Sequence, residues 1–228
     1  SNIYLQKKYI KLKGDKIILK AVIFDMDGVI IDSEPMHYDV NQEIFKELGF
    51  NISDTEYNSY IGVSNTEMWT LIKQNHKTAK TVEELTEKLI NKNIEHLKNT
   101  QVDPISGVVS LMKELDKYNI KIALASSSPM KLIDLVVNKF SIKKYFNLIE
   151  SGENVAEGKP APDLFLKVAD DMDITPEDIV VIEDSYNGVM AAKKAGMNCV
   201  GYKNLNSKFP SLLSFLLLQM YWSGYHHK

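Results

Sequence analysis

Arginine is absent from this sequence of 228 residues, so all 27 of its basic residues are lysines. Arginine supplies the planar guanidinium that holds a phosphate group through two parallel hydrogen bonds, whereas lysine supplies a compact point charge. Any phosphate that this protein binds must therefore be met by lysine side chains, backbone N–H groups or a metal ion.

The sequence also has little net charge, because 30 acidic residues nearly balance the basic ones and leave a formal charge of −3. A nucleic-acid-binding protein concentrates positive charge, and this composition offers no such excess. We therefore expect no nucleic acid among its partners.

Cysteine occurs once, as Cys199, so the chain cannot form an internal disulfide. Such sparing use of cysteine is typical of proteins in a reducing compartment. The first residues include no apolar stretch of the kind that a secretory signal needs. We therefore expect a cytoplasmic protein.

A long apolar stretch, Phe209–Trp222, lies near the C-terminus. It is shorter than the about 20 residues that span a bilayer, so we expect no contact with a membrane. Residues 206–228 are interpreted as an apolar segment with a helix that begins at Pro210 and packs on the core. A contact between copies of the chain is the alternative, so we expect a monomer, or else a dimer.

Four short runs of apolar residues mark the strands of a parallel sheet: Ala21–Phe24, Ile120–Leu124, Ile179–Ile182 and Asn198–Gly201. Near-continuous apolar runs are typical of strands that are buried on both faces. Amphipathic segments alternate with them at Met36–Leu48, Pro129–Phe140, Pro162–Val168 and Tyr186–Ala195. This alternation predicts an α/β fold with a doubly wound, Rossmann-like sheet.

Residues 33–103 interrupt the alternation, because they are polar and helix-prone and contain no clear strand. Three amphipathic segments predict helices here, at Ser53–Tyr60, Asn65–Asn75 and Thr81–Leu97. We expect an all-helical cap, residues 33–103, inserted after the first core strand. The core would then comprise residues 16–32 and 104–205. Residues 1–15 would be an N-terminal extension, whose alternating segment Tyr9–Lys13 predicts one strand of a hairpin with Lys16–Leu19.

Polar side chains follow the predicted strands at the points where the strands end. Asp25 and Asp27 follow the first strand, Ser126–Ser128 the second, and Glu183-Asp184 the third. Lys159 lies in the loop between the second and third. Because ligands of open α/β sheets bind beyond the carboxyl ends of the strands, we expect these groups to converge.

The carboxylates favour a bound cation. Asp25 and Asp27 are two residues apart, so in extended chain they face the same ligand, and their like charges favour a shared proton or a cation. Asp184 adds a third carboxylate, and a site made of oxygen ligands prefers a hard cation such as Mg²⁺. Gly28 allows the close turn that presents this loop to a ligand.

The segment from Asp25 to Pro35 resembles the first motif of the haloacid dehalogenase superfamily. Ser126, Lys159 and Glu183-Asp184-Ser185 resemble its second, third and fourth motifs. The likeness covers about residues 16–203. It is strongest to the branch with a helical cap between the first two motifs, which contains β-phosphoglucomutase and many small-molecule phosphatases.

The resemblance implies a Mg²⁺-dependent phosphatase that hydrolyses a small phosphomonoester, such as a sugar or polyol phosphate. Asp25 would attack phosphorus and form an aspartyl-phosphate, and Asp27 would protonate the leaving oxygen and later deprotonate the attacking water. Ser126, Ser127 and Lys159 would bind the transferring phosphoryl group.

The resemblance also implies the ligands of the metal ion. These would be the Asp25 carboxylate, the Asp27 main-chain carbonyl and Asp184, with Glu183 as a further candidate. The dehalogenases that name the superfamily need neither an acid at the position of Asp27 nor Mg²⁺. Asp27 and Asp184 together therefore indicate phosphoryl transfer.

His37 and Asn65, both in the predicted cap, are the candidate residues for contact with the rest of the substrate. In the mutase, an Arg matches Asn65 and grips a second phosphate, and a Lys matches Ile61. This sequence lacks both cations, which disfavours a β-phosphoglucomutase-like mutase but leaves it as the alternative.

Two hypotheses from other classes fit less well. A phospho-accepting receiver domain also combines aspartates, a hydroxyl and a lysine, but it is about half this length and arranges its acids differently. A silent interaction protein that uses the apolar C-terminal segment would not need the complete set of motif residues.

Overall fold

The computed structural model describes residues 9–12, 15–60 and 64–202 of the chain. These residues form two compact units, one of residues 9–12, 15–32 and 103–202, and one of residues 33–60 and 64–102. The predicted C-terminal helix and the residues Ile61, Gly62 and Val63 lie outside the described residues.

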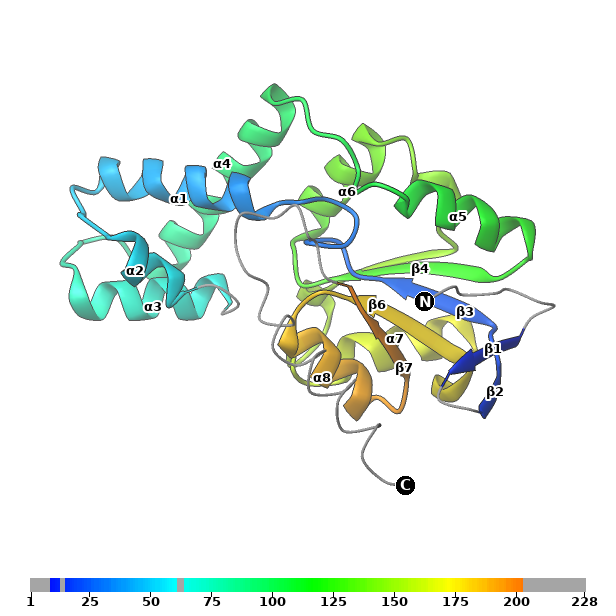
Figure 1. The fold of residues 1–228 in the computed structure, drawn as a ribbon. Helices are drawn as coiled ribbons and strands as arrows, with labels where there is room; N and C mark the ends of the chain where they lie inside the picture. Colours follow the sequence, from blue (N-terminus) through cyan, green and yellow to red (C-terminus); the bar gives the residue numbers. More distant parts are fainter. Residues whose placement is uncertain (1–8, 13–14, 61–63, 203–228) are drawn as a thin grey trace, which may run out of the picture. The chain divides into compact units, whose positions relative to one another are not determined.

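The first unit is built on a sheet of five parallel strands in the order β5-β4-β3-β6-β7 (Figure 1). The strands are β3 (Ala21–Phe24), β4 (Lys121–Ser126), β5 (Leu148–Ser151), β6 (Ile179–Glu183) and β7 (Asn198–Gly201). From β3 the chain adds β4 and β5 on one side and then β6 and β7 on the other. The end of β3 is therefore the switch point at which open α/β sheets bind ligands.

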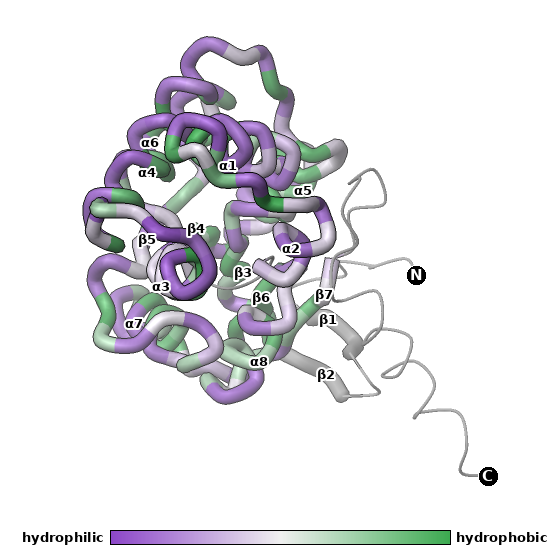
Figure 2. The backbone as a smooth tube through the Cα atoms, turned by 90° about the vertical axis from the view of Figure 1, so that its left-hand side faces the viewer, coloured by the Kyte–Doolittle hydropathy of each residue, from purple (hydrophilic) through white to green (hydrophobic). Residues whose placement is uncertain are grey.

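Helices cover both faces of this sheet, as Figures 1 and 2 show from two directions. The helices α5 (Val108–Lys117) and α6 (Met130–Lys139) lie on one face, and α7 (Asp163–Met172) and α8 (Tyr186–Lys194) on the other. This arrangement confirms the predicted doubly wound α/β fold. All four residues of β3 are buried, which explains their unbroken apolar run.

Alternate strand residues form the core on the side of α7 and α8. Ala123 and Ala125 of β4 point to this side together with Ile23 of β3 and Val181 of β6. The alanines are small, and the ring of Phe165 on α7 is fully buried in the same cluster. This packing fixes the carboxyl ends of the strands at one edge of the sheet.

Two elements of this unit were not predicted. The strand β5 was missed because its charged Glu150 breaks the apolar run that predicts the central strands. The helix α5 does carry a signal, because its buried residues Val108, Met112 and Leu115 recur at helical spacing. Three short 3₁₀ turns connect further elements: η1 (Lys143–Tyr145), η2 (Gly152–Asn154) and η3 (Pro176–Asp178).

The predicted N-terminal hairpin is confirmed. The strands β1 (Tyr9–Leu12) and β2 (Asp15–Ile18) pair in antiparallel fashion, with Tyr9 opposite Ile18. They form a separate two-stranded sheet that precedes β3.

The second unit, called here the helical unit, contains α1 (Glu34–Glu47), α2 (Asp54–Asn58), α3 (Asn65–Asn75) and α4 (Val82–Asn99). Its described residues are all helical or loop, which confirms an all-helical insertion after the first core strand. The aromatic rings of Phe45 and Trp69 meet edge to face with centroids 5.8 Å apart. Thr81 and Glu84 form a reciprocal capping box that begins α4. None of the described helices in either unit is long and apolar enough to cross a membrane.

Candidate active site

The register of the sheet brings the predicted site residues to one edge. Phe24 at the end of β3 lies opposite Leu124 of β4 and Ile182 of β6. Asp25, which follows Phe24, is therefore level with the ends of both neighbouring strands. Ser126 and Glu183 are the last residues of their strands, whereas the sequence analysis placed them just after the strands.

Lys159 joins two carboxylates at this edge. Its Nζ lies 2.6 Å from Oδ1 of Asp25 and 2.8 Å from Oε1 of Glu183. The same ammonium lies 4.9 Å above the ring of Phe165, which the α7 side of the core holds in place. Its side chain is 6% exposed, so the loop that carries it directs a charged group into the interior. The structure thus brings together Asp25, Lys159 and Glu183, as expected from the motifs.

Burial changes the acid–base properties of this cluster. Burial raises the pKa of Asp25 to about 7, and the negative charges of Glu183 and Asp27 add to this effect while Lys159 opposes it. Burial also disfavours the ammonium of Lys159, but Asp25 and Glu183 outweigh it and raise the pKa of Lys159 above its usual value. The site therefore holds a permanent cation beside more carboxylate groups than that cation can neutralise.

Three carboxylates at this edge could hold a metal ion together. Asp25, Glu183 and Asp184 each offer one oxygen, and these oxygens lie within 4.8 Å of one another. Oxygen ligands of this kind fit a hard divalent cation.

Gly28 makes room for this cluster. A Cβ at Gly28 would lie 1.8 Å from Oδ2 of Asp184, and the backbone φ of +76° is one that glycine adopts without strain. The turn after β3 therefore requires glycine for two independent reasons. It is the close turn that the sequence predicted.

Glu183 is held by more than Lys159. Its Oε2 accepts hydrogen bonds from the backbone N–H and the side-chain hydroxyl of Ser185, at 2.8 and 2.9 Å. A Cβ at Gly188 on α8 would lie 1.6 Å from Oε1 of Glu183, so the carboxylate fills the space that this glycine leaves. Glu183 is therefore a fixed partner of Lys159, and its role as a metal ligand stays a prediction.

The loop after β4 lies against Asp27. The hydroxyl of Ser128 donates a hydrogen bond of 2.8 Å to Oδ2 of Asp27, and its backbone N–H donates one of 3.0 Å to Oγ of Ser126. From the sequence, Ser126 and Ser127 were predicted to bind phosphate, and no role was predicted for Ser128. The three consecutive serines were a signal, but the sequence does not show which hydroxyl faces Asp27. Phosphate binding by Ser126 and Ser127 stays a prediction.

The other two predicted residues belong to the helical unit. His37 lies on α1, and Asn65 is the first residue of α3, directly after the N-cap Ser64. Their contact with a substrate stays a prediction.

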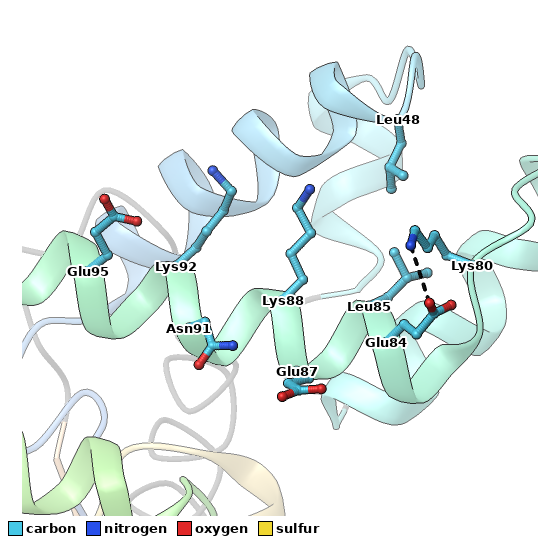
Figure 3. Close-up of a pocket in the computed structure, with 9 residues that line it drawn as sticks. All are labelled: Leu48, Lys80, Glu84, Leu85, Glu87, Lys88, Asn91, Lys92 and Glu95. Atoms are coloured by element: carbon cyan, nitrogen blue, oxygen red, sulfur yellow. Dashed lines mark hydrogen bonds and ion pairs between the residues drawn. The ribbon is translucent and has the colours of Figure 1, made fainter.

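The helical unit also has a surface pocket along α4, which Figure 3 shows. It is lined by Leu48, Lys80, Glu84, Leu85, Glu87, Lys88, Asn91, Lys92 and Glu95. None of the predicted site residues is among them, and its lysines form ion pairs with neighbouring glutamates. We therefore regard the core unit, and not this pocket, as the place of the chemistry.

The fold and the site define a haloacid dehalogenase-like hydrolase. Residues 22–202 match the sequence profile of the haloacid dehalogenase-like hydrolase family, and the chain belongs to that family.

Among the relatives are enzymes that act on phosphorylated sugars. The chain is 35% identical over 190 residues to the β-phosphoglucomutase of Bacillus subtilis, and this alignment covers 80% of this chain and 83% of that protein. It is 29% identical over 179 residues to the phosphorylated carbohydrates phosphatase of Thermotoga maritima, with 78% and 82% covered. Among solved structures, β-phosphoglucomutase from Clostridium difficile superposes with a TM-score of 0.71 at 28% identity, covering 91% of this chain and 98% of that one.

Proposed function

We propose that this protein is a Mg²⁺-dependent phosphatase that hydrolyses a small phosphomonoester, most suitably a sugar or polyol phosphate. The observation that carries the proposal is the cluster at the end of β3. There, the buried Asp25 lies 2.6 Å from Lys159, beside Glu183 and Asp184. Membership of the hydrolase family supports the same reaction.

Asp25 is the proposed nucleophile. A carboxylate oxygen of Asp25 forms a bond to phosphorus while the bond from phosphorus to the leaving oxygen breaks, which gives an aspartyl-phosphate. Asp27 gives a proton to the leaving oxygen. In the second step Asp27 takes a proton from water, and that water releases inorganic phosphate and restores Asp25.

Lys159 and the loop after β4 bind the phosphoryl group in this proposal. Lys159 supplies a fixed positive charge beside Asp25, which suits a chain without arginine. The hydroxyls of Ser126 and Ser127 are the proposed partners of the remaining phosphoryl oxygens. Phosphoryl transfer depends mainly on such positioning and charge neutralisation.

A divalent cation fits the remaining negative charge of the site. Asp25, Asp184 and the main-chain carbonyl of Asp27 would hold it, with Glu183 as a further candidate. When bound, Mg²⁺ would neutralise negative charge on the phosphoryl oxygens and orient the phosphate for in-line attack.

The substrate class follows from the relatives and from the available residues. The phosphatase of Thermotoga maritima named above acts on phosphorylated carbohydrates, and a hexitol phosphatase of Escherichia coli is 29% identical over 186 residues. His37 and Asn65 of the helical unit are the proposed contacts with the non-phosphate part of the substrate. A phosphorylated metabolite is thus the proposed partner.

A panel assay tests the proposal. Phosphate release is measured from sugar phosphates, polyol phosphates, nucleotides and p-nitrophenyl phosphate, each with Mg²⁺ and with a chelator. We expect release that requires Mg²⁺, that is fastest with a sugar or polyol phosphate, and that Asp25→Asn abolishes.

The proposal fails if the folded wild-type protein releases no phosphate from any of these compounds, or if Asp25→Asn retains wild-type rates. Asp134→Asn is a matched control, because Asp134 is an exposed aspartate in the same unit that pairs with Lys143. This control should not change the rates.

A further inference from the structure

Ser128 contacts Asp27, which is the proposed general acid and general base, but Ser128 itself has no role in the proposed reaction. Its hydroxyl donates to Oδ2 of Asp27 at 2.8 Å, although the two residues are 101 positions apart in the sequence. A hydroxyl can donate to one carboxyl oxygen both when the carboxyl group is ionised and when its other oxygen carries a proton, and the bond to the ionised form is among the stronger ones in proteins. The contact is therefore strong enough to influence where the Asp27 carboxylate points.

Two strands hold the backbone of Ser128 in place. Its N–H donates to Oγ of Ser126 at 3.0 Å, and its carbonyl accepts a hydrogen bond of 2.8 Å from the hydroxyl of Ser151. Ser126 ends β4 and Ser151 ends β5, the two lie opposite each other in the sheet, and both are fully buried. The position of Ser128 is thus set by the sheet itself.

Gly152 brings the end of β5 close to the same loop. A Cβ at Gly152 would lie 3.2 Å from the Cα of Ser127, which is closer than nearly all real contacts of this kind. The loop after β4 therefore packs directly on the chain that follows β5.

We propose that Ser128 is a positioning residue that holds the Asp27 carboxylate in the orientation from which it protonates the leaving oxygen. This inference rests on the proposed phosphatase function and adds a residue to it. The final torsion of an aspartate side chain is broad, so a hydrogen bond such as the one from Ser128 favours one orientation of the carboxylate. Ser128 keeps its own proton throughout, and the transferred proton moves from Asp27 to the leaving oxygen.

The role of Ser128 should depend on the leaving group. An alkoxide from a sugar is a poor leaving group and needs a proton, whereas the p-nitrophenolate ion leaves with little help. Because kcat/KM reports on steps up to the first cleavage of the bond to phosphorus, it isolates the step in which Asp27 acts as the acid. Misplacing Asp27 should therefore harm the alkyl ester far more than the aryl ester.

The experiment compares kcat/KM for glucose 6-phosphate and p-nitrophenyl phosphate in Ser128→Ala, Ser128→Thr and the wild-type protein. We expect Ser128→Ala to lower kcat/KM for glucose 6-phosphate about tenfold or more and for p-nitrophenyl phosphate less than about threefold. Ser128→Thr keeps the hydroxyl and should restore most of the loss. Ser110→Ala makes the same change at an exposed position of α5 and should alter neither value.

Equal losses with both substrates, no loss with either, or a threonine variant as impaired as the alanine variant would each overturn the role of Ser128. If Ser128→Ala does not fold, the Ser151→Ala variant is tested instead. Ser151→Ala removes the hydrogen bond to the Ser128 carbonyl but keeps the Ser128 hydroxyl. Equal losses in that variant overturn the role as well. A wild-type protein that hydrolyses none of the compounds in the panel above overturns the proposed function, and this inference with it. If glucose 6-phosphate is not hydrolysed, the fastest sugar or polyol phosphate of the panel takes its place.

Discussion

At the scale of single residues, the site depends on an imbalance of charge around Lys159. One buried ammonium contacts Asp25 and Glu183, while Asp27 and Asp184 lie on the same edge of the sheet. Burying a charge without a partner is costly, so this arrangement is stable only with Lys159 and with a proton or a cation to neutralise the remaining charge. Burial raises the pKa of Asp25 to about 7, and the negative charges of Glu183 and Asp27 add to this effect.

The raised pKa of Asp25 predicts how stability changes with pH in the metal-free protein. The unfolded chain loses this proton near pH 3.8, whereas the folded protein keeps it up to about pH 7. Between these values the folded state binds more protons, so the free energy of unfolding contributed by Asp25 falls as the pH rises. We expect urea unfolding in the presence of a chelator to show this fall in the wild-type protein.

Asp25→Asn removes the titrating group and should flatten that fall. The stability of Asp25→Asn relative to the wild-type protein should therefore rise between pH 4 and pH 7. A constant difference between the two proteins over this range would contradict the raised pKa. Asp134→Asn, at an exposed position, should keep a constant difference from the wild-type protein.

At the scale of secondary-structure elements, ion pairs connect α1 and α4 within the helical unit. Glu47 of α1 pairs with Lys88 and with Lys92 of α4, the latter at 2.8 Å, and Lys92 also lies 2.7 Å from Glu43. Figure 3 shows Lys88 and Lys92 extending from α4 toward α1. Hydrogen bonds from the two lysines lower the pKa of Glu47 to about 2.

Glu47→Gln should weaken this contact modestly. The Glu47 side chain is 40% exposed, so solvent screens its pairs, and we expect a loss of about 0.5–1 kcal/mol in the free energy of unfolding at pH 7 and low salt. A carboxylate with a lowered pKa contributes its full stability above pH 4.5 and loses it as the pH falls toward about 2.

The measurement is urea unfolding of both proteins at pH 7, 4 and 3, and at pH 7 in 1 M salt. The difference between them should shrink at pH 3 and in high salt. Glu95→Gln, at an exposed position further along α4, is the matched control. A difference that is independent of both pH and salt would show that Glu47 acts through packing rather than charge.

At the scale of the whole molecule, the relatives named above represent two related reactions, hydrolysis of a phosphate ester and phosphate transfer within a sugar. The chain is 35% identical to a β-phosphoglucomutase, yet it has Asn65 and Ile61 where the resemblance leads us to expect an arginine and a lysine. A mutase must hold two phosphates at once, and the lack of cations at these two positions disfavours that reaction.

We therefore expect that, with β-glucose 1-phosphate as the substrate, free phosphate forms faster than the product glucose 6-phosphate. Both products are measured in one reaction, by phosphate detection and by a coupled dehydrogenase. Asn65→Arg should shift the ratio toward glucose 6-phosphate, and Asn65→Gln, which adds length without charge, should not. Faster formation of glucose 6-phosphate by the wild-type protein would favour the mutase.

Much of the fold and of the site could be predicted from the sequence, because the signals were local. The unbroken apolar run Ala21–Phe24 marks a strand buried on both faces, and the spacing of Asp25 and Asp27 predicts that both face one ligand. The absence of arginine indicated that lysine, backbone N–H groups or a metal ion would bind a phosphate, and the resemblance to the third motif singled out Lys159. Strand β5 was not predicted, because the charged Glu150 interrupts its apolar run.

Only the tertiary structure decided which of these groups touch. Lys159 meets Asp25 across 134 residues of sequence, and Ser128 meets Asp27 across 101. No local pattern selects Ser128 from three consecutive serines, because the choice depends on the register of β4 with β5 and on the hydrogen bond from Ser151. Residue types and their spacing determined the chemistry available to this protein, and the packing of the parallel strands decided its geometry.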